Sequence, residues 1–133
     1  MPPFPANTAL AAALLTLLQI GLTVLVIRAR RGLRVNLGDG GNDTMQKRVR
    51  MHGNLTENAP LFLILLGLLE IGGGAPLLVR VAGPVFVVAR LCQAYGISEW
   101  ATPGANPFRV TGVAGTIGCL VILALALLAR VFA

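Results

Sequence analysis

The chain has 133 residues, of which 56% are hydrophobic and only 12% are charged, and its mean hydropathy is +0.79. About a quarter of the residues of a soluble domain are charged, so this composition excludes an ordinary soluble globular protein. The formal net charge of +6 does not indicate nucleic-acid binding, because the basic residues flank apolar segments without interleaved aromatic residues. We expect a single membrane-embedded domain over residues 1–133.

Four apolar stretches approach the length of about 20 residues that a membrane-spanning helix needs. They cover 8–27, 55–71, 75–97 and 110–132. The second is short for a bilayer core about 30 Å thick at 1.5 Å per residue, so it must borrow polar residues that precede it. The spans are therefore predicted at about 8–28, 46–71, 75–97 and 108–132. Short connections favour an all-α, integral membrane four-helix up-and-down bundle.

Basic residues gather around the first connection, where seven of the eleven occur. These are Arg28, Arg30, Arg31, Arg34, Lys47, Arg48 and Arg50. The positive-inside rule then makes this connection cytoplasmic and puts both termini outside the cytoplasm. The proline-rich N-terminus lacks a basic region, so the first span is expected to be an uncleaved anchor. The arginine-rich composition is compatible with a bacterial inner membrane.

A polar stripe opens the second span. Its members are Lys47, Arg50, Asn54 and Glu57. Because they recur at intervals of three, four and three residues, they share one helix face that runs from the cytoplasmic edge into the membrane. Pro60 removes the backbone donor for the carbonyl of Thr56 and favours a kink below the stripe. Snorkelling to water explains Lys47, but Glu57 lies too deep for it.

Glu57 needs a partner at membrane depth. It lies 14 residues before Ile71, and Arg90 lies 15 residues after Ala75, so both belong roughly 20 Å from the outer boundary at 1.5 Å per residue. Two opposite charges at one depth cost far less together than apart. The sequence therefore predicts an intramembrane ion pair between Glu57 and Arg90.

The same residues carry a family resemblance. The second span contains an Arg-x-x-x-Asn-x-x-Glu pattern followed by Pro60, the third contains Arg90-Leu91-Cys92-Gln93-Ala94-Tyr95-Gly96, and Arg109 opens the fourth. Over nearly its whole length the chain resembles the MAPEG family, the membrane-associated proteins in eicosanoid and glutathione metabolism. Asn58 stands where the eicosanoid-making members often carry tyrosine, so the chain is more similar to the small bacterial members.

The resemblance implies a homotrimer that binds glutathione, as co-substrate, between neighbouring protomers near the cytoplasmic face. The residues that it implies for glutathione binding are Arg28, from the neighbouring first span, and Arg50, Asn54, Glu57, Arg90 and Tyr95. Arg109 would lie nearest the sulfur, where a guanidinium favours the nucleophilic thiolate. The implied activity is that of a detoxifying transferase or peroxidase that acts on small lipophilic electrophiles.

Two other function classes remain. A non-catalytic structural or partner-binding bundle would need Glu57 and Arg90 for folding but not Arg109. A small multidrug transporter needs an ionisable residue in an early span to couple proton movement to transport. The first span offers only Gln19, which is not ionisable, so the sequence argues against this class.

Several residues receive no chemical role. His52 points to another helix face than the stripe, and Cys92 and Cys119 lack the spacing of metal ligands. Glu70 is expected to reach water at the outer end of the second span, and Trp100 to lie at a membrane interface. A last group recurs every third residue on the fourth span and predicts close helix packing. It consists of Gly112, Gly115 and Gly118.

Overall fold

The computed structural model describes residues 4–99 and 106–132, and these form four long helices. Their bounds are Ala6–Leu33 (α1), Asp43–Ile71 (α2), Pro76–Ser98 (α3) and Pro107–Phe132 (α4). Each is long and apolar enough to cross a membrane. The expected all-α membrane fold is therefore confirmed, and α2 does begin within the polar segment before its apolar stretch. Trp100 lies outside the described residues.

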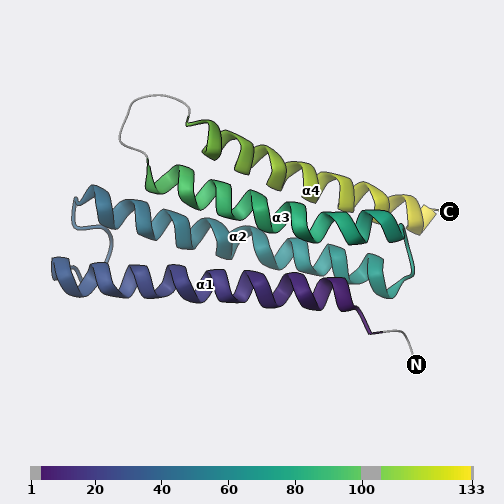
Figure 1. Ribbon diagram of the computed structural model, residues 1–133, viewed down its shortest axis with the longest axis horizontal. Coiled ribbons are helices and arrows are strands. Elements are labelled where there is room, and N and C mark those ends of the chain that lie inside the picture. Colours follow the sequence, from purple (N-terminus) through teal and green to yellow (C-terminus); the bar gives the residue numbers. More distant parts are fainter. Residues whose placement is uncertain (1–3, 100–105, 133) are drawn as a thin grey trace.

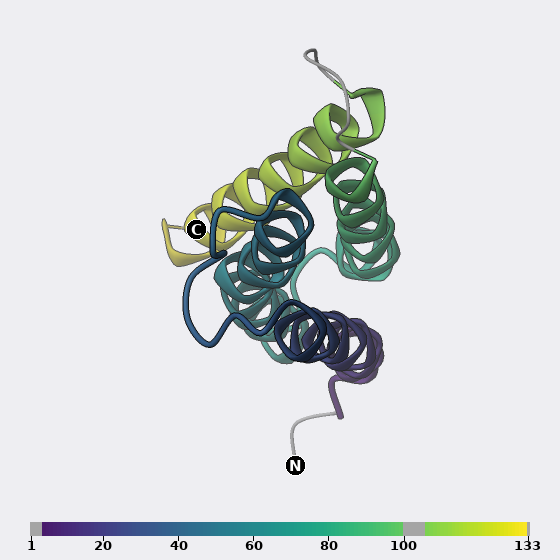
Figure 2. The ribbon, with the colours of Figure 1, turned by 90° about the vertical axis from the view of Figure 1, so that its left-hand side faces the viewer.

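Successive helices run in opposite directions, so the bundle is up-and-down (Figure 1). Seen from one end, α1 and α4 lie on opposite sides of α2 and α3 (Figure 2). Every pair of helices is in contact except α1 with α4, within the part of the chain that the structure describes. Helices α2 and α3 consequently separate α1 from α4.

Residues next to the first turn determine where α2 and α3 begin. Asn42 precedes α2, and its side-chain oxygen accepts a hydrogen bond of 3.0 Å from the backbone N–H of Met45. This bond satisfies one of the donors that a helix N-terminus leaves unpaired. Pro76 begins α3, where its missing N–H costs nothing.

The start of α1 is held by α2. The Glu70 carboxylate accepts four hydrogen bonds of 2.7–2.9 Å, two from the backbone N–H groups of Asn7 and Thr8 and two from their side chains. The expectation that Glu70 simply reaches water is wrong. A carboxylate at a helix N-terminus accepts hydrogen bonds from the unpaired backbone N–H groups, and its negative charge interacts favourably with the positive end of the helix dipole. These two effects explain why Glu70 faces the start of α1.

The core lies where α2 and α3 meet. The rings of Phe62 and Phe86 stack with their centroids 3.8 Å apart, and both side chains are fully buried. By contrast, large apolar side chains are exposed along all four helices, among them Leu17, Ile64, Val88 and Leu125. An apolar surface of this extent suits lipid rather than water.

Close packing of α3 against α4 depends on glycine. A Cβ at Gly112 would lie 2.6 Å from the backbone nitrogen of Gln93 and 2.7 Å from the carbonyl oxygen of Ala89. One at Gly115 would lie 2.9 Å from the Cβ of Ala89. The packing role predicted for these two is confirmed, but it is wrong for Gly118, which has no atom within 4 Å of such a Cβ because it faces away from α3.

Candidate functional site

Arg90 is the most deeply buried charged residue, with 3% of its surface exposed. Its Nη1 donates to the side-chain oxygen of Asn54 on α2 at 2.6 Å. Its Nη2 donates to the side chains of Gln93, one turn further along α3, and Thr116 on α4. The carbonyl oxygen of Gly112 lies 3.3 Å from the same nitrogen. The guanidinium therefore joins three helices.

The predicted ion pair between Glu57 and Arg90 is wrong. Arg90 makes no ion pair with any carboxylate within residues 4–99 and 106–132, and Glu57 is exposed on the surface of the protomer. The charge is solvated instead by amide, carbonyl and hydroxyl dipoles, with the ring of Phe86 5.4 Å from its Cζ. Oriented dipoles provide an alternative to a counter-ion for a buried cation.

A polar groove of about 150 Å³ opens beside this cluster between α2, α3 and α4. Asn54 and Asn58 line it from α2, Arg90 and Gln93 from α3, and Thr116 from α4. Because Arg90 already occupies the side-chain oxygen of Asn54, the amide of that residue is fixed in orientation. Its Nδ2 donates no bond among the described residues and remains available to a ligand.

Two further arginines flank one end of the groove. Arg50 lies one helical turn before Asn54, about 6 Å along α2, and Arg109 lies two turns before Thr116 on the same face of α4, about 10 Å along it. Both side chains are exposed. Since α2 and α4 run in the same direction (Figure 1), these arginines lie toward the same end of the bundle.

The remaining predicted residues lie elsewhere in the protomer. Glu57 follows Asn54 by three residues on the same side of α2, and it is exposed and does not line the groove. Tyr95 is 52% exposed and packs edge-on against Phe108, with ring centroids 5.0 Å apart, outside the residues that line the groove. Arg28 is exposed on α1, a helix without contact to α4. One protomer thus unites Asn54 and Arg90 but not the whole set.

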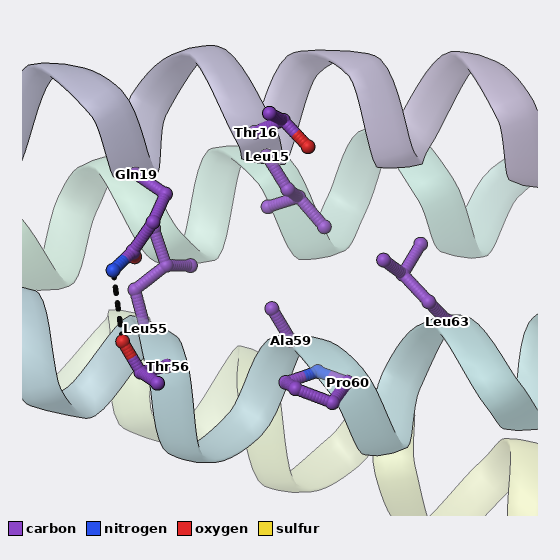
Figure 3. Close-up of a pocket in the computed structure, with 8 residues that line it drawn as sticks. All are labelled: Leu15, Thr16, Gln19, Leu55, Thr56, Ala59, Pro60 and Leu63. Atoms are coloured by element: carbon purple, nitrogen blue, oxygen red, sulfur yellow. Dashed lines mark hydrogen bonds between the residues drawn. The ribbon is translucent and has the colours of Figure 1, made fainter.

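A second, apolar groove of about 330 Å³ lies between α1 and α2 (Figure 3). At its rim Gln19 donates from Nε2 to the hydroxyl of Thr56 at 2.8 Å, and the same nitrogen lies 2.7 Å from Nε2 of His52. His52 therefore faces α1 and not the stripe, as its position in the sequence predicted. Leu15, Ala59 and Leu63 supply much of the apolar wall (Figure 3).

Residues 8–129 match the MAPEG family. The chain belongs to this family. Inner membrane protein YecN of Escherichia coli strain K12 is 33% identical over 103 residues, which are 74% of this chain and 79% of YecN. YecN of Escherichia coli O6:H1, strain CFT073, matches with the same identity and coverage. The resemblance inferred from the motif residues is confirmed.

For this MAPEG protein, two groove residues escaped the sequence interpretation. Gln93 and Thr116 both accept from Arg90, yet neither carries a charge that marks it. The signal for Gln93 was its spacing, since it follows Arg90 by three residues and so shares its helix face. Thr116 lay within the glycine-rich face of α4 and had no such signal. Neutral acceptors are difficult to find because packing, and not composition, selects them.

Proposed function

We propose that this MAPEG protein is a membrane-bound glutathione-dependent transferase or peroxidase that acts on lipophilic electrophiles. The observation that carries the proposal is the polar groove at membrane depth, where Arg90 fixes the Asn54 amide and leaves its Nδ2 unused. Arg50, Asn54 and Glu57 on one side of α2 then present a cation, an amide and a carboxylate. These groups match the carboxylates, peptide bonds and ammonium of a charged tripeptide.

The chemical step needs a thiolate. A free thiol has a pKa near 8.5, and a fixed guanidinium close to the sulfur favours its ionised form. Arg109 is proposed for this role, because it lies toward the end of the groove where Arg50 lies. The thiol proton leaves to water. The thiolate sulfur then attacks an electrophilic carbon, whose leaving group departs with the bonding electron pair, and a thioether forms. With a peroxide, the sulfur attacks one oxygen and the O–O bond breaks; the alkoxide takes a proton from water, and a second glutathione converts the sulfenic acid into glutathione disulfide and water.

The proposed assembly is a homotrimer in the bacterial inner membrane. Two observations support a second copy at the site. Arg28 lies on a helix that does not touch α4, and Tyr95 lies outside the groove that Arg90 lines. The inner-membrane placement rests on the similarity to inner membrane protein YecN. In this assembly Arg28 reaches the glutathione site from the neighbouring protomer. Tyr95 contacts the glutathione that is bound between the two protomers.

The decisive experiment titrates the detergent-solubilised protein with glutathione, following heat and the ultraviolet absorbance of the thiolate. We expect binding with thiolate formation, about 10-fold or more weaker binding in Glu57→Gln, which removes one charge-assisted contact, and loss of the thiolate alone in Arg109→Leu. Arg80→Gln, at the other end of the bundle, is the control and should bind as the unmodified protein does. Absence of binding at millimolar glutathione would contradict the proposal.

One observation favours a second candidate, a non-catalytic bundle. The acceptors of Arg90 all lie in its own protomer, so the cluster is stable without any ligand. Under this alternative Arg90 matters for folding, while Arg109→Leu changes neither stability nor ligand binding. The same titration separates the two candidates, because only the enzyme proposal requires an Arg109-dependent thiolate.

A further inference from the structure

A third groove lies in the half of the bundle opposite to Arg50 and Arg109, between the first three turns of α1 and of α3. It has a volume of about 340 Å³. Its apolar wall includes Leu10 and Leu14 from α1 and Val87 and Val88 from α3, and Arg80 lines it as well. The volume is at the lower limit of known ligand sites. The groove is therefore amphipathic, with one cation above an apolar floor.

The spacing of the lining residues explains this shape. Arg80, Gly83 and Val87 follow each other at intervals of three and four, so they share the face of α3 that looks toward α1. Gly83 has no side chain, and a Cβ built on it would lie 3.6 Å from the Cβ of Ala11. The helices approach closely at this point, and the groove lies beside the contact.

Arg80 has no anionic partner among the residues that the structure describes. It is exposed, and no hydrogen bond or ion pair involves it within the two ranges that the structure describes. The other basic residue at this end of the bundle, Arg130, donates to the carbonyl oxygen of Gly72. Glu70, the acidic residue at this level, is occupied by Asn7 and Thr8. Since no carboxylate among the described residues pairs with Arg80, its guanidinium is available to an anion from outside the chain.

The position of Arg80 indicates the source. It is the fifth residue of α3, about 6 Å from the start of the helix, which corresponds to the level of the lipid headgroups. The side chains below it extend to Val88, about 12 Å further into the membrane. In the described part of a second copy in the same orientation, Glu70 is the acidic side chain at this level, and that carboxylate is already used.

We propose that this groove binds one anionic phospholipid. The phosphate pairs with the guanidinium of Arg80, whose planar donors suit phosphate oxygens. One acyl chain lies along Leu10, Leu14 and Val88, and the remainder of the lipid stays in the surrounding bilayer. The site is separate from the groove around Arg90 and does not depend on the glutathione proposal.

The test compares lipids with identical acyl chains. Protein in neutral detergent is mixed with equal amounts of phosphatidylglycerol and phosphatidylcholine, and retained lipids are counted by native mass spectrometry. We expect a preference of about fivefold for phosphatidylglycerol, the factor that corresponds to about 1 kcal/mol for one basic side chain near an anionic surface. Arg80→Gln should abolish the preference, and Arg80→Lys should retain part of it.

The matched control is Arg31→Gln, which removes an exposed arginine from the last turn of α1 at the other end of the bundle. It should keep the preference for phosphatidylglycerol. Equal loss in Arg31→Gln and Arg80→Gln would overturn the proposal, since the preference would then come from the general positive charge. Retention of the full preference in Arg80→Gln would overturn it as well.

A second measurement locates the acyl chain. The protein has one tryptophan, Trp100. Leu14→Trp combined with Trp100→Phe therefore leaves a single tryptophan, and this tryptophan lies in the groove. Phosphatidylglycerol with brominated acyl chains should quench it more strongly than brominated phosphatidylcholine, and Arg80→Gln should remove the difference. Equal quenching by both lipids would mean that only bulk lipid covers the groove, and would overturn the proposal.

Discussion

At the scale of single residues, the buried Arg90 determines what the site can be. Its guanidinium lies at membrane depth without a carboxylate, bonded to neutral groups from three helices. One of its nitrogens, Nε, is buried without a hydrogen-bond partner. Removing any acceptor leaves part of a buried charge unsolvated, and this costs more than the loss of an ordinary surface bond.

Thr116→Val tests this solvation. The substitution keeps the shape of the side chain and removes the hydroxyl that accepts from Arg90. We expect a loss of about 1–3 kcal/mol in unfolding free energy, measured by denaturation in detergent. Thr111→Val is the control, because the Thr111 hydroxyl also bonds the carbonyl four residues before it, at 2.8 Å, but is exposed. Equal effects of the two substitutions would show that Arg90 does not depend on Thr116.

The sequence was sufficient to identify Arg90 as a residue that needs partners, but not to find them. Depth along a helix follows from residue number, and this led to Glu57 as the partner. The direction of a side chain around the helix axis also matters, and here Asn54, three residues earlier, is the one that faces α3. Neutral acceptors such as Thr116 carry no mark in the sequence, because they become acceptors only when helices pack.

At the scale of helices, the contact between α3 and α4 places Arg90 against its acceptors. Gly112 provides both the close approach and a carbonyl oxygen near Arg90. Hydropathy predicted three of the four spans directly, because those apolar stretches are long enough, and the second span was predicted by extending a short apolar stretch into the polar segment before it. It did not predict how α1 begins, since the partner of its first turn, Glu70, is more than 60 residues away in the chain.

Gly112→Ala should force α3 and α4 apart. The new methyl group would lie within 2.7 Å of backbone atoms of Ala89 and Gln93, which cannot rotate away. We expect a destabilisation of about 1–3 kcal/mol, the range for overpacked sites, together with weaker glutathione binding. Gly118→Ala on the same helix meets no atom within 4 Å and should be neutral or slightly stabilising, by up to about 1 kcal/mol. A reversed order of the two thermal midpoints would refute this assignment.

At the scale of the whole molecule, the separation of α1 from α4 by α2 and α3 is the main feature. Helices α1 and α4 lie on opposite sides of the bundle (Figure 2). Of the predicted site residues, Arg28 lies on α1 and Arg109 on α4, and the others lie on α2 and α3. Composition and motif spacing identified the family. They did not show which residues a single protomer brings together, because that depends on the rotation of each helix in the bundle.

The homotrimer proposal predicts a protein mass of three chains of 13.9 kDa in light scattering that is corrected for detergent. It also predicts a cross-link between Arg28→Cys in one chain and Arg109→Cys in another, with Cys92 and Cys119 replaced by serine. Since α1 and α4 do not touch within a protomer, this product should appear as a dimer band when differently tagged variants are co-expressed. A monomeric mass, or cross-links only within single chains, would contradict the trimer.

The bond between Glu70 and the first turn of α1 also bears on how the protein is made. Synthesis begins at the N-terminus, so the ribosome must add residue 70 before the amides of Asn7 and Thr8 can meet their acceptor. Until then α1 is an emerging helix with unpaired donors at its leading end. The first helical hairpin is therefore completed late, when almost all of α2 has left the ribosome, and a chain interrupted before Glu70 lacks the contact that fixes α1 against α2.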